Sequence, residues 1–110
     1  MRKIETANNF TAKDNFNITG AETLDSVKGT VIRVVGCALG EDVSAETGEV
    51  VKTGYLKDID GNIYSTISPT AMQSIDALAD MELSEDSAVD IRINSRTSKG
   101  GRSFIVLTMV

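Results

Sequence analysis

Apolar residues gather in short runs that predict five strands. The run from Thr30 to Ala38 is β-branched and apolar on both faces, as in a central strand, and Gly36 within it predicts a bulge or bend. Around Val89 to Asn94 apolar and polar residues alternate, which indicates a strand with one buried face. The remaining strands are predicted over Val50–Lys57, Asn62–Ser68 and Phe104–Val110.

The segments between these strands carry helix and turn signals. Ser68-Pro69 supplies an N-cap followed by proline at the first helical position, and apolar residues then recur at helical spacing. A helix is therefore predicted at about Pro69 to Asp80. Asp60-Gly61 indicates a hairpin between the second and third strands. The four acids between Gly40 and Glu49 indicate a long exposed loop.

The order of these elements predicts a mainly β protein. Three strands, a helix and two strands fit the OB-fold, a five-stranded antiparallel barrel with one helix between strands 3 and 4. An α+β sheet with one helix packed on a single face is the alternative architecture. We place the OB-fold domain at residues 23–110, after a flexible or irregular N-terminal arm at residues 1–22 that contains Phe10 and Phe16.

Composition excludes several kinds of active site. The 110 residues suit one domain, and they include no histidine and one cysteine, Cys37. Histidine-based triads, histidine zinc sites and intramolecular disulfides are therefore impossible, and Cys37 is expected to be buried packing. The glycines form no phosphate-binding loop. We expect no enzymatic activity, no cofactor and no metal.

Hydropathy along the chain bears on where the protein acts. The amino terminus lacks the apolar stretch of a secretion signal, and no apolar run approaches the length of a membrane span. The sequence therefore predicts a soluble, cytoplasmic protein with no membrane partner.

Charge is distributed unevenly. The net charge of -5 argues against a protein that coats duplex DNA by bulk positive charge. From Asp58 to Ile91 there are eight acids and no base, whereas from Ile91 to Val110 there are four bases and no acid. One end of the fold is thus expected to be basic, around the turn that contains Lys99. In the alternative interpretation this turn is only a solvated hairpin tip.

The predicted hairpin at Asp60-Gly61 groups aromatic and basic side chains. A tight turn places Tyr55, Lys57 and Tyr64 on one face, where the rings can stack on any base and the ammonium can meet phosphate. A looser turn that pairs Asp58 with Asn62 puts the two tyrosines on opposite faces. Alternatively, the tyrosines only cap the barrel edges with their hydroxyls in water.

Four stretches resemble the small single-stranded DNA-binding proteins of tailed bacteriophages: Gly29–Gly40, Thr53–Asp58, Gly61–Ser68 and Gly101–Leu107. The likeness is one of pattern and covers about Leu24 to Val110. It implies an OB-fold protein that coats DNA strands displaced during phage replication, without sequence preference, in the cytoplasm of a bacterial host. Single-stranded DNA and replication proteins are the implied partners. The implied stacking and phosphate contacts map to Tyr55, Tyr64, Lys57 and the hairpin from Arg96 to Arg102.

Sequence-independent binding of single-stranded DNA is accordingly the predicted function. The candidate nucleic-acid-binding residues are the two tyrosines and the cations of the predicted strands and the last hairpin: Tyr55, Lys57, Tyr64, Lys52, Arg33, Arg92, Arg96, Lys99 and Arg102. The alternative function is an acidic protein-interaction or DNA-mimic module that acts on a host or replication protein. The acidic loop and the negative net charge favour that alternative.

Overall fold

Strands dominate the structure, a computed structural model that describes residues 3–43 and 46–110. They account for 47% of the described residues, which confirms the mainly β class. The strands are β1 (Lys3–Asn8), β2 (Glu22–Thr23), β3 (Val31–Val43), β4 (Val50–Asp58), β5 (Ile63–Thr66), β6 (Val89–Thr97) and β7 (Ser103–Met109). The α-helices are α1 (Ala12–Asn17) and α2 (Pro69–Ala79), and short 3-10 turns form η1 (Ile18–Gly20) and η2 (Leu24–Val27).

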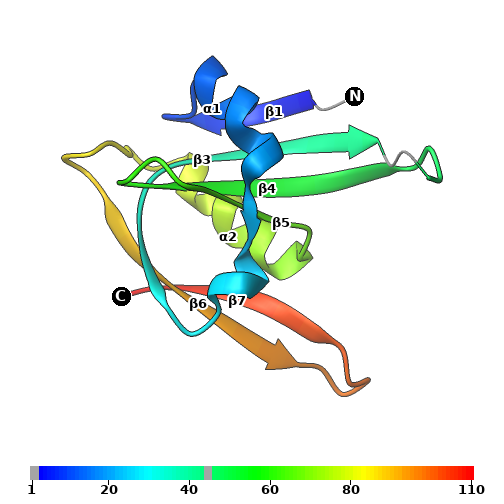
Figure 1. Ribbon diagram of the computed structural model, residues 1–110. Helices are drawn as coiled ribbons and strands as arrows, with labels where there is room; N and C mark the ends of the chain where they lie inside the picture. Colours follow the sequence, from blue (N-terminus) through cyan, green and yellow to red (C-terminus); the bar gives the residue numbers. More distant parts are fainter. Residues whose placement is uncertain (1–2, 44–45) are drawn as a thin grey trace.

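One curled sheet contains all seven of these strands. Its order is β2-β5-β4-β3-β6-β7, with β1 also paired to β3, and Figure 1 shows how it wraps around α2. The expectation of five strands is therefore wrong by two. The additional strands, β1 and β2, lie in polar stretches whose composition conceals them. Helix α2 lies between the third and fourth of the five expected strands, as predicted.

Strand β3 is the centre of the sheet because it has three partners. It pairs with β4 along one edge, and along the other with β6 at Val31–Val34 and then with β1 at Cys37–Glu41. The register with β4 shifts between Val34 and Gly36, which confirms the predicted bulge. Pairing with β4 carries β3 on to Val43, so the predicted exposed loop from Gly40 is shorter than expected.

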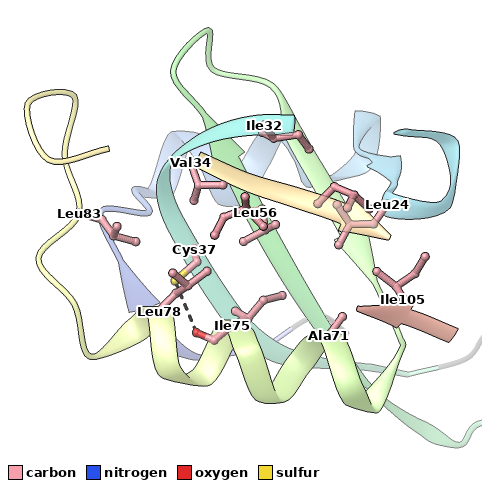
Figure 2. Close-up of a cluster of buried hydrophobic side chains, with 12 residues drawn as sticks. Leu24, Ile32, Val34, Cys37, Leu56, Ala71, Ile75, Leu78, Leu83 and Ile105 are labelled. Carbon is pink, nitrogen blue, oxygen red and sulfur yellow. Dashed lines mark hydrogen bonds between the residues drawn. The ribbon is translucent and has the colours of Figure 1, made fainter. Parts of the chain in front are cut away.

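The main core fills the space between the sheet and α2. Leu56, Ile75, Ile93 and Val34 are fully buried there, and Figure 2 shows the helix side chains meeting those of the strands. Cys37 belongs to this cluster, with its Sγ 3.9 Å from the carbonyl oxygen of Ile75. Burial raises the pKa of its thiol to about 11, so the thiol stays protonated at neutral pH. The expectation of a buried packing role for Cys37 is confirmed.

A second, smaller core lies on the other face of β4. It contains Tyr55, Ala38, Ile63 and Ile18, and Phe10 packs against it. The segment expected as an irregular arm thus forms a strand and a helix that cover this face. Its few apolar side chains anchor it, and apart from the buried Asp14 most of the polar residues between them face solvent, which is why the sequence looks like a lead-in.

The sheet does not close into a barrel. In the described part of the chain, β2 takes the outer edge of β5, and no ladder joins β5 to β7. Instead, the hydroxyl of Ser68 donates to the carbonyl oxygen of Ile105 and accepts from its N–H, both at 3.3 Å. We call this opening between β5 and β7 the seam.

Candidate nucleic-acid interface

The β4–β5 hairpin adopts the looser of the two expected registers. The Asp58 N–H donates to the carbonyl oxygen of Asn62 at 3.0 Å, and Tyr55 pairs with Ser65 while Leu56 pairs with Tyr64. The Asp58 carboxylate holds this wide turn, because it accepts from the backbone N–H groups of residues 60 and 62 at 3.0 and 2.8 Å. The two tyrosines therefore lie on opposite faces, and the prediction that they share one face is wrong.

Tyr55 is buried rather than presented to a ligand. Only 3% of its surface is exposed, and its ring stacks on Phe10 with 6.1 Å between centroids. Tyr64 is half-buried against the main core, and its hydroxyl donates to Asp58 Oδ2 at 3.2 Å. Burial, with the negative charge of Asp58, raises the pKa of Tyr64. Neither ring is an open stacking platform.

Lys57 is equally covered. Its Nζ lies 2.7 Å from Asp14 Oδ2, and the two side chains are only 12% and 13% exposed. Burial opposes ionisation of Asp14, but hydrogen bonds from Lys57 and Thr11 and the charge of Lys57 outweigh it and hold the pKa of Asp14 below its ordinary value. Lys57 therefore ties α1 to β4, and a phosphate would have to displace Asp14 to reach it.

Two further candidate cations carry acidic partners. Arg33 Nε lies 3.1 Å from Asp90 Oδ1, and Lys52 Nζ lies 3.4 Å from Glu41 Oε1. Both pairs are largely exposed, so each contributes little to stability. Their positive charge is partly neutralised all the same, and Lys52 stands apart from the other candidates on the β3–β4 hairpin.

The remaining four cations come together on one element. Four exposed cations lie on β6 and on the turn that joins it to β7: Arg92, Arg96, Lys99 and Arg102. Within residues 3–43 and 46–110 none of them has an acidic partner. We call the β6–β7 hairpin with these four side chains the basic ribbon. Figure 1 shows it projecting from the body of the sheet.

One aromatic side chain joins the basic ribbon. In the β6–β7 ladder Arg96 pairs with Phe104, Asn94 with Val106 and Arg92 with Thr108. Directly paired residues lie on the same face of a sheet, so Phe104 stands beside Arg96 on the outer side. Sequence reasoning missed Phe104 because it treated residues 104–110 only as an apolar strand. The position of the Gly100-Gly101 turn is the signal that would have found it, because counting residues outward from that turn on both strands pairs Phe104 with Arg96.

A groove runs along the seam beside the basic ribbon. It has a volume of about 720 Å³, and its walls include Ile67 and Ser68 on one side and Arg102, Phe104 and Ile105 on the other. We call it the seam groove. A shallower depression of about 380 Å³ over β4 and β5 shares Ser65 and Ile67 with it, so the two hollows adjoin.

Within the described ranges, no helix is long and apolar enough to cross a bilayer. Comparisons with protein-family models, with curated proteins and with solved structures returned no match.

Proposed function

We propose that this chain is an OB-fold protein that binds single-stranded DNA without sequence preference, through the basic ribbon. The observation that carries the proposal is the exposed, acid-free group of Arg92, Arg96, Lys99 and Arg102 with Phe104 in register beside Arg96. Guanidinium and ammonium groups contact phosphates, and an aromatic ring stacks on any base. No catalytic group, metal or cofactor is required for this task.

Strand pairing supports the OB-fold part of the proposal. Strands β3 to β7 are five successive strands with α2 between the third and the fourth, and β3 pairs with both β4 and β6. This is the arrangement of an OB barrel opened between its third and fifth strands. On this view β1, α1 and β2 are additions that cover one face and one edge.

Coverage of the β4–β5 face relocates the proposed site. OB-folds bind oligonucleotides on the face of their second and third strands and with the loops joining strands 1–2 and 4–5. Here that face is occupied by Phe10 and α1, whereas the loop joining the fourth and fifth strands carries Lys99 and Arg102. Binding is therefore centred on the basic ribbon, with Tyr55 and Lys57 as supports of the fold. Coating of strands displaced during DNA replication is the cellular role we propose.

Oligo-dT binding tests this function directly. A variant with Arg96→Gln, Lys99→Gln and Arg102→Gln is compared with wild type by anisotropy of a labelled oligonucleotide. We expect about 100-fold weaker binding at about 0.1 M salt, because three lost phosphate contacts change the salt exponent by about 2. A control variant with Lys3→Gln, Lys13→Gln and Lys52→Gln removes the same charge elsewhere and should bind like wild type.

The acidic interaction module is the rival function, and one observation favours it. Asp58, Glu85 and Asp86 border a common depression near α1. This module needs no affinity for DNA, so its prediction for the same experiment is that wild type does not bind oligo-dT at all. That outcome would replace our proposal by the rival.

A further inference from the structure

The seam leaves an unfilled space where a closed barrel would have a ladder. Ser68 bridges to Ile105 at one point, and the seam groove of about 720 Å³ lies around this bridge. A volume of that size falls within the range of about 300–1,000 Å³ that is typical of ligand pockets. The groove is thus large enough for a planar ring system with its attached sugar.

The lining of the seam groove has a distinctive chemistry. Seven of its fourteen lining residues are serine or threonine, and five are apolar, among them Leu24, Ile67 and Phe104. A hydroxyl both donates and accepts a hydrogen bond, so it can serve the edge of any base. Apolar side chains shield the faces of a ring from water. This combination suits a nucleobase without selecting one base over another.

The groove is also continuous with the basic ribbon. Phe104 and Arg102 belong to both, and Ile67 stands on the opposite wall with 68% of its surface exposed. The charged residues of the lining are Arg102, on the side of the basic ribbon, and Asp25, on the opposite side. A strand whose phosphates follow the basic ribbon would therefore have its bases directed into the groove.

We propose that the seam groove is a base-binding subsite that receives unstacked nucleobases of a single strand held on the basic ribbon. The inference rests on the proposed function and deepens it, since it assigns the bases to a place that the cations alone do not define. Phe104 forms the edge that the strand crosses, and Ile67 forms the far wall. The hydroxyls of the groove other than that of Ser68, which is engaged with Ile105, give hydrogen bonds that are indifferent to sequence.

A tryptophan placed on the groove tests this subsite, because the chain contains none of its own. In an Ile67→Trp variant we expect oligo-dT to quench the tryptophan emission and to do so in step with the anisotropy of the labelled oligonucleotide. The control is Ile59→Trp, on the turn at the other end of β5, where the side chain is also exposed and no quenching is expected.

A substitution that changes no charge supplies a second measurement, the affinity for oligo-dT. Ile67→Ser should weaken oligo-dT binding about tenfold, within the range for losing one base contact, and should leave the salt dependence of affinity unchanged. The subsite would be overturned if Ile67→Ser bound oligo-dT as tightly as wild type and oligo-dT did not quench the emission of Ile67→Trp. The basic ribbon would then remain the proposed binding surface. Absence of any wild-type binding would instead overturn the proposed function itself.

Discussion

Asp14 and Lys57 meet where α1 packs on β4, and the fold depends on their pairing. Both side chains are almost fully buried, so either charge left alone would be costly. We expect Lys57→Met to lower the free energy of unfolding by about 3 kcal/mol at pH 7, measured by urea denaturation. Lys13→Met, on the exposed side of the same helix, is the control and should change stability little.

Acid provides an independent check of the same pair. The pKa of Asp14 is lowered in the folded protein, so its contribution to stability is present above the unfolded pKa of about 3.9 and is lost as pH falls through the folded value. The difference in unfolding free energy between wild type and Lys57→Met should therefore shrink between about pH 5 and about pH 2. A difference that stays constant over this range would show that the ion pair is not its cause.

Gly40 is required for another reason: the backbone of β1 approaches it too closely for a side chain. A Cβ atom added at Gly40 would collide with the carbonyl oxygen of Lys3, and would lie 3.2 Å from the Cα of Ile4. We expect Gly40→Ala to destabilise the protein by about 1–3 kcal/mol in thermal or urea unfolding. Gly20→Ala is the control, since nothing lies within 4 Å of a Cβ there. Equal stability of the two variants would mean that β1 does not pack on β3 as described.

Among the elements, the β4–β5 hairpin and the basic ribbon carry aromatic residues with opposite roles. Tyr55→Ala should cost about 3–5 kcal/mol of stability, the range for truncating a large buried aromatic ring, while oligo-dT affinity per folded molecule stays unchanged. Phe104→Ala should weaken oligo-dT binding by about 1–3 kcal/mol, the range for one base stack. Unfolding and binding titrations on both variants separate the two roles. Tyr55→Ala weakening binding with its fold intact would contradict this assignment.

At the level of single elements, the sequence predicted those features that depend on a few neighbouring residues. The start of α2 at Pro69, the bend at Gly36 and the alternation in β6 each follow from a few neighbouring residues. The β4–β5 register was not determined in this way, because the Asp58 carboxylate and not the Asp60-Gly61 pair sets the width of the turn.

The candidate site was predictable only where it depends on one element. The four cations of the basic ribbon are close in sequence, so they remained together in the structure. Tyr55 and Lys57 were covered by Phe10 and Asp14, which approach from more than 40 positions away. Partners that distant leave no periodicity or spacing for a sequence pattern to reveal.

The charge asymmetry of the whole molecule gives the proposed DNA binding a direction. The chain carries a net charge of -5, while residues 91–110 contain four bases and no acid. The negative remainder repels a polyanion from other surfaces, so the field of the molecule favours approach along the basic ribbon.

The salt dependence of oligo-dT affinity distinguishes most sharply between a basic ribbon that binds phosphates and one that is only solvated. Four contacts from the basic ribbon predict a slope of log affinity against log salt of about -3 for wild type, at about 0.7 per contact. The variant with Arg96→Gln, Lys99→Gln and Arg102→Gln should flatten that slope by about 2. The same slope in the variant and in wild type, with affinity intact, would show that the basic ribbon is a solvated turn and not the binding surface.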